Sequence, residues 1–108
     1  MSTITIKVGL NENKVPQTIH WSADDGGITD EDAKAMMLSM WDDKAKQAVR
    51  MDLWTTEMLV DEMKQFMHQT MLTMADSLEC ATGDKKLSGD VRDFCRYFAE
   101  KSDIIAPE

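Results

Sequence analysis

The spacing of apolar residues changes once along this chain, and that change limits the fold to strands followed by helices. Residues 3–10, "TITIKVGL", alternate apolar and polar side chains with a period of two, the pattern of a half-buried strand. From residue 58 onward the apolar spacing becomes three and four, as on one face of a helix. Strands first and helices afterwards are typical of an α+β domain.

Two β-hairpins are predicted in the first half. The first joins strands 3–10 and 15–22 through the polar turn "NENK". The segment 33–54 supports two interpretations. Ala, Lys, Met and Leu favour a helix over 33–42, whereas apolar alternation before and after "DDKAKQ" favours a second hairpin with strands 35–42 and 48–54. We adopt the hairpin because one rule then explains both halves, and we expect Trp41 opposite Arg50 across it.

Two helices are predicted in the second half, at 58–82 and 88–102. Gly83 is suited to end the first helix, and Ser88 is suited to cap the second. The predicted architecture is a single α+β domain over residues 1–108. Its antiparallel sheet consists of two consecutive hairpins in a four-stranded meander, packed on one face by the two C-terminal helices.

The segment "DDGGITDED", residues 24–32, carries five carboxylates and two adjacent glycines. Taking Gly27 as position six of an EF-hand loop places Ala33 at position twelve, where a carboxylate is needed. Taking Gly26 there places Trp21 at position one. The segment is therefore predicted to be a solvated connector with one helical turn at 30–34, and no metal site is expected.

The charge and hydropathy of the chain restrict its partners and location. Twenty acidic and twelve basic residues give a net charge of -8, and no Lys/Arg cluster suggests nucleic-acid binding. No apolar run reaches the roughly 18 residues of a membrane span, and no secretory signal is recognised at the N-terminus. We expect a cytoplasmic protein whose Cys80 and Cys95 are reduced thiols.

No catalytic, cofactor or metal residues are predicted. His20 and His68 have no second His or Cys at a ligand spacing, and no glycine-rich phosphate loop occurs. Nothing marks a pair of carboxylates as buried with pKa values driven apart. The expectation is a protein that is not an enzyme.

One surface is a candidate partner-contact face. Under the hairpin interpretation, the outer side of the second hairpin carries two tryptophans without a covering helix, which suggests a protein partner or self-association. The alternative is that the C-terminal tail, or snorkelling of the tryptophan side chains themselves, covers their apolar surface. The candidate residues are Met37, Trp41, Arg50, Asp52 and Trp54, beside His20.

Three stretches together resemble the gliding-motility protein GldC family: "IKVGLNENKVPQTIHWSADDGG", "LSMWDDKAKQAVRMDLWTTEMLVDEMKQFMHQT" and "DFCRYFAEK". The resemblance implies a small soluble protein associated with bacterial gliding and without assigned catalytic residues. The favoured hypothesis is a non-catalytic cytoplasmic accessory protein that binds a protein partner. Two alternatives stay open: a small enzyme or ligand binder with a pocket between sheet and helices, and a chaperone-like homo-oligomer.

Overall fold

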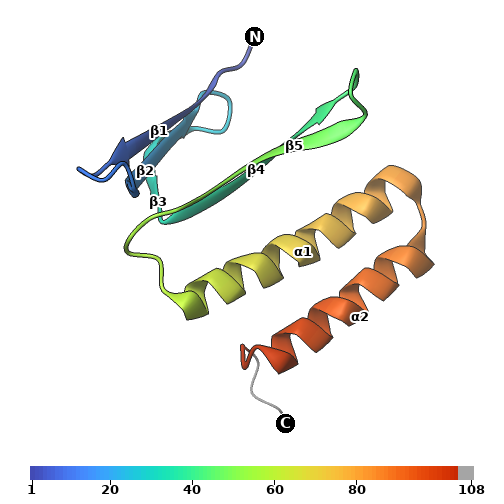
Figure 1. Cartoon of the computed structure of the whole chain (residues 1–108). Coiled ribbons are helices and arrows are strands. Elements are labelled where there is room, and N and C mark those ends of the chain that lie inside the picture. Colours follow the sequence, from blue (N-terminus) through green and yellow to red (C-terminus); the bar gives the residue numbers. More distant parts are fainter. Residues whose placement is uncertain (105–108) are drawn as a thin grey trace. The chain divides into compact units, whose positions relative to one another are not determined.

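The computed structural model describes residues 1–104, which form two compact units (Figure 1). The first unit, Met1–Met58, contains five strands, and the second, from Leu59 onward, contains two helices. The prediction of an α+β protein with antiparallel strands before helices is confirmed. The predicted packing of the helices on one sheet face involves both units and stays a prediction.

The first three strands form an antiparallel sheet in the order β1 (Ile4–Leu10), β2 (Pro16–Ala23) and β3 (Ile28–Ala33). The first hairpin is confirmed, with Val8 opposite Ile19, whose side chain is only 2% exposed. The connector prediction is right for the turn at 24–27 but wrong beyond it, because the expected helical turn at 30–34 lies largely in β3. An edge strand buries little, so the polar run "TDED" can pair without apolar alternation.

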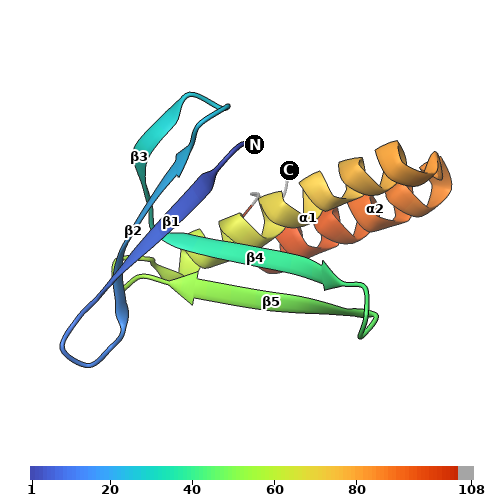
Figure 2. The same ribbon diagram turned by 90° about the horizontal axis from the view of Figure 1, so that it is seen from above.

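The last two strands, β4 (Ala35–Asp42) and β5 (Gln47–Trp54), form a separate two-stranded sheet, called the ribbon below (Figure 2). This confirms a hairpin over a helix for 33–42. The prediction of one four-stranded meander is wrong, because the described strands divide into sheets of three and two.

The register of the ribbon differs by two residues from the prediction. Trp41 lies opposite Ala48, and Arg50 lies opposite Ser39. The cause is the turn, where Oδ1 of Asp42 accepts hydrogen bonds from the backbone N–H groups of Lys44 and Ala45 at 3.0 and 3.3 Å. These bonds close a shorter turn than "DDKAKQ" suggested, so β5 begins at Gln47.

Thr55 forms hydrogen bonds to the residue that connects the two sheets. One residue, Lys34, separates β3 from β4, and its carbonyl accepts the backbone N–H of Thr55 at 2.8 Å and the Thr55 hydroxyl at 2.6 Å. The next amide, that of Thr56, donates to the carbonyl of Pro16 at the start of β2. Thr55 is 5% exposed, so its hydroxyl bond is a buried one.

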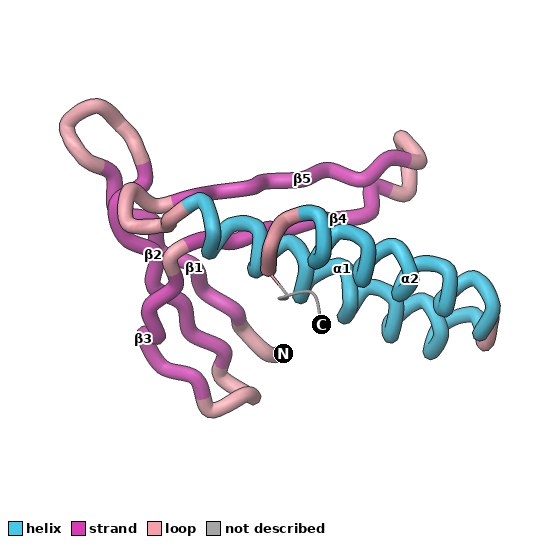
Figure 3. Tube along the Cα trace, turned by 90° about the horizontal axis from the view of Figure 1, so that it is seen from below, coloured by secondary structure: helices cyan, strands magenta, loops and turns pink. Residues whose placement is uncertain are grey.

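The second unit is a helical hairpin of α1 (Val60–Thr82) and α2 (Lys85–Lys101), which lie side by side in Figure 3. Gly83 ends α1 with a φ of 71°, as predicted. The predicted start of α2 at residue 88 is wrong, because Asp84 accepts a hydrogen bond from the Leu87 N–H at 2.9 Å and caps the helix earlier. Ser88 is instead a fully buried helical residue.

Small side chains form the buried part of the helical hairpin: Ala75, Ser88, Cys95 and Ala99. The predicted methionine stripe is only partly buried, since Met74 remains 60% exposed. Small side chains allow two helices to approach closely, which leaves longer neighbours at the margin of the contact. At that margin, Arg92 of α2 donates to Asp76 and Glu79 of α1 at 2.9 and 3.0 Å.

Replacing Thr55 with Val should lower the free energy of unfolding by about 1 kcal/mol, because the isosteric change removes one buried hydroxyl bond. The Lys34 carbonyl would keep the backbone bond from residue 55. Urea unfolding followed by circular dichroism measures the change. Thr56→Val is the matched control at an exposed site. Equal stability of the Thr55→Val and wild-type chains would contradict the assigned role.

Candidate functional site

Five of the six predicted contact residues lie on one face of the ribbon, called the tryptophan face. Alternation along β4 places Met37 and Trp41 on the same side, and their cross-strand neighbours are Asp52 and Ala48. Arg50 and Trp54 follow from the same alternation on β5. Trp41 is 65% exposed, so a large aromatic surface faces solvent.

Arg50 organises the polar part of the tryptophan face. Its Nη2 lies 3.0 Å from Oδ1 of Asp52 and 3.4 Å from the Sδ of Met37. The predicted opposition of Arg50 and Trp41 is wrong, because the register places Ser39 across from Arg50. The face therefore combines the Arg50–Asp52 ion pair with the exposed indole of Trp41, which lies two residues beyond Ser39 on β4.

His20, the sixth predicted contact residue, does not belong to the tryptophan face. It lies on β2, in the three-stranded sheet, opposite Asp32 of β3. Its Nδ1 is enclosed and lies 2.8 Å from Oδ1 of Asp32, but the approach is out of line for a hydrogen bond. The imidazole thus has a carboxylate neighbour that the sequence did not predict, because β3 was not recognised.

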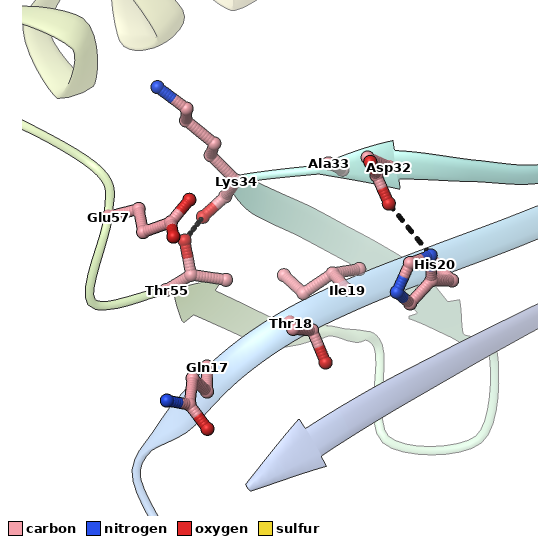
Figure 4. Close-up of a pocket in the computed structure, with 9 residues that line it drawn as sticks. All are labelled: Gln17, Thr18, Ile19, His20, Asp32, Ala33, Lys34, Thr55 and Glu57. Carbon is pink, nitrogen blue, oxygen red and sulfur yellow. Dashed lines mark hydrogen bonds and ion pairs between the residues drawn. The ribbon is translucent and has the colours of Figure 1, made fainter. Parts of the chain in front are cut away.

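A cavity of about 510 Å³ lies beside this His20–Asp32 pair (Figure 4). His20 and Asp32 point toward each other across β2 and β3, whereas the Lys34 side chain extends away from them. The buried Ile19 and Thr55 form part of the wall. The full lining is Gln17, Thr18, Ile19, His20, Asp32, Ala33, Lys34, Thr55 and Glu57.

A β-bulge beside the cavity brings a second carboxylate near His20. The β2–β3 register shifts between Trp21 and Ala23, and Asp30 has a φ of 50°, an uncommon value for a residue other than glycine. The Asp30 N–H donates to the Ser22 hydroxyl at 2.9 Å. Oδ1 of Asp30 lies 3.8 Å from Nδ1 of His20, so the ring has two acidic neighbours.

These acidic groups do not converge on a metal position. Within residues 1–104, no group of three or more His, Cys, Asp or Glu side chains has a geometry that could hold a metal ion. Neither described helix is long and apolar enough to cross a membrane. The two candidate sites among the described residues are therefore the tryptophan face and a polar cavity beside the half-exposed imidazole of His20.

A family model described as "Gliding motility-associated protein GldC-like" matches residues 16–104. The chain belongs to the GldC-like family. The match runs from β2 to the residues after α2, so the tryptophan face and the cavity both lie within the family's segment. No curated protein and no solved structure matches this GldC-like chain.

The two cysteines of this GldC-like chain differ in environment. Both are free thiols, with Cys80 exposed and Cys95 fully buried in α2. Burial raises the pKa of the Cys95 thiol, because the thiolate would lose its hydration. The reactive thiolate of Cys95 is thus disfavoured both by access and by protonation.

Thiol titration of the folded protein should therefore modify Cys80 rapidly and Cys95 only after unfolding. We expect one reactive thiol per native chain with Ellman's reagent at pH 8, and two in 6 M guanidinium chloride. Cys80→Ser, at the exposed position, should abolish the rapid native reaction. Rapid modification of Cys95 in native Cys80→Ser would contradict the buried placement.

Proposed function

We propose that this chain is a non-catalytic accessory protein of gliding motility that acts in the cytoplasm by binding a protein partner through the tryptophan face. Family membership supports the process. The exposed Trp41 beside Met37 and the Arg50–Asp52 ion pair supports the mode of action. The single observation that carries the proposal is a tryptophan that is 65% exposed on a sheet face.

The composition of the face fits protein recognition. Tryptophan, methionine and arginine are enriched where proteins meet, and tryptophan and arginine recur among the residues that dominate binding energy. The Arg50 guanidinium is held between a carboxylate and a thioether, so fewer conformations are lost on binding. The tail alternative concerns residues beyond 104, which lie outside the described chain.

Trp41→Ala should remove the partner. A tagged copy would be crosslinked in the native host, and co-purifying proteins would be quantified by mass spectrometry. We expect at least one specific partner to fall roughly tenfold or more in the variant, the loss typical of a dominant interface residue. Circular dichroism checks that the variant stays folded.

Val49→Ala is the matched control, because Val49 is a similarly exposed apolar residue, 57% exposed, on the opposite face of the same ribbon. Its partners should equal those of the wild type. Capture that is unchanged in Trp41→Ala, or lost equally in both variants, would reject the tryptophan face as the binding surface.

The cavity favours a second candidate function, binding of a small polar ligand. His20 and the carboxylates of Asp32 and Glu57 border the cavity, and a ligand with N–H donors would satisfy the carboxylate acceptors. This cavity lies at the junction of β2, β3 and the segment after β5, inside the first unit, rather than between sheet and helices.

This second function is tested by NMR titration with a panel of small amines and amino acids. A ligand of the cavity should shift the methyl resonances of Ile19 and Ala33 in the wild type and have at least tenfold weaker affinity for His20→Ala. His68→Ala is the control for loss of an imidazole elsewhere. Absence of saturable shifts at roughly 10 mM ligand would exclude binding of this class.

A further inference from the structure

We propose that this chain forms a two-fold symmetric dimer in which the outer edge of β5 pairs antiparallel with β5 of a second copy. In the described part of the chain, β5 forms a backbone ladder with β4 and with no other strand. A two-stranded ribbon is marginally stable in water, and its edges present N–H and C=O groups for pairing. Joining two ribbons would produce a four-stranded sheet.

The charge order of β5 is complementary to itself. Arg50 and Asp52 lie two residues apart on the same face, with Met51 between them. When two copies pair antiparallel about Met51, Arg50 of each copy faces Asp52 of the other, which creates two cross-strand pairs of opposite charge. Both side chains are accessible, at 51% and 40% exposure.

The same charges disfavour the two adjacent symmetric registers. A shift that places residue 50 opposite its own copy sets two Arg50 side chains against each other, and a shift about residue 52 does the same with Asp52. Like charges directly opposite each other on a sheet are destabilising. Charged residues on an edge also discourage pairing with unrelated strands. A closed dimer is thus favoured over open assembly.

The outer edges of the other described strands lack this property. The β3 strand carries Asp30, Glu31 and Asp32 in succession, so self-pairing would accumulate negative charge. Each of the other two strands carries one charged residue, Lys7 in β1 and Asp42 in β4. When such a strand pairs with its own copy, no residue of opposite charge is available on the second copy. Among the described edge strands, β5 therefore has the charge order that suits pairing with a second copy.

The ribbon has no net charge, which also favours association of two copies at this part of the chain. Residues 35–54 contain three acidic and three basic residues, so the net charge of -8 resides entirely outside the ribbon. Two acidic chains repel each other least where their local charge is zero. The inference goes beyond the proposed function, since its occupant is a second copy and not a separate partner.

The mass of the purified protein, measured by sedimentation equilibrium, tests the dimer. The wild type should reach twice the 12.3 kDa chain mass. Arg50→Asp and Asp52→Arg should each raise the dissociation constant roughly tenfold or more, because both cross-strand pairs become like-charged. An equimolar mixture of the two variants should form a heterodimer, since two acidic positions in one chain would face two basic positions in the other.

Two results would overturn the proposal. One is a wild-type chain that remains monomeric at roughly 1 mM. The other is a dimer whose stability neither charge reversal changes, which would place the contact on another surface. These measurements use purified protein alone, so they are independent of the partner-capture experiment with Trp41→Ala.

Disulfide trapping tests the register in a Cys80→Ser background. Met51 would face its own copy, so Met51→Cys should form a disulfide-linked dimer under mild oxidation. Val49→Cys is the matched control, since residues 49 and 51 are 57% and 54% exposed on the same side of β5. In the proposed register, position 49 faces Leu53, and its own copy lies roughly 13 Å away, too far for a disulfide. Equal trapping at both positions would reject this register.

Discussion

The first unit depends on the carbonyl of Lys34. This one oxygen accepts both the backbone N–H and the hydroxyl of Thr55, and it stands at the only residue between the two sheets. Two donors on one carbonyl fix the end of β5 against the start of β4. The adjacent bond from Thr56 to Pro16 attaches the same segment to β2. The wall of the cavity and the start of the ribbon therefore share one buried anchor.

The tryptophan face and the cavity arise from different structural features. The face depends on strand alternation, which keeps Trp41, Arg50 and Asp52 on one side of a regular ribbon. The cavity depends on the convergence of three segments, since β2 contributes His20, β3 contributes Asp32 and the residues after β5 contribute Thr55. The neighbouring bulge brings the carboxylate of Asp30 toward the same His20. The regular tryptophan face would suit a large partner. The cavity, with its few polar groups, would suit a small molecule.

Much of the fold was predictable because it follows from periodicity. The ribbon and the helices were visible in apolar spacing, and the error of two residues in the ribbon register left every side chain on its predicted face, since strands alternate with a period of two. The exact pairing was not predictable from alternation, because the backbone contacts of Asp42 decide the turn.

Other features have no apolar signal to read. The β3 strand has its half-buried residues, Ile28 and Ala33, only at its ends. The helical contact is built on Ala75 and Ser88, which periodicity analysis passes over in favour of methionine. The cavity residues could not be assembled from the sequence, since Asp32 and Thr55 approach His20 only through an unrecognised strand and a tertiary hydrogen bond.

The connectivity has a kinetic consequence. Each extensive pairing joins elements that are consecutive in the chain: β1 with β2, β2 with β3, β4 with β5, and α1 with α2. Folds dominated by such short-range contacts lose little loop entropy before native contacts form, and they fold quickly. Each hairpin can form soon after its residues leave the ribosome. The bond from Thr55 to Lys34, which spans 21 residues, would then be among the later contacts to form.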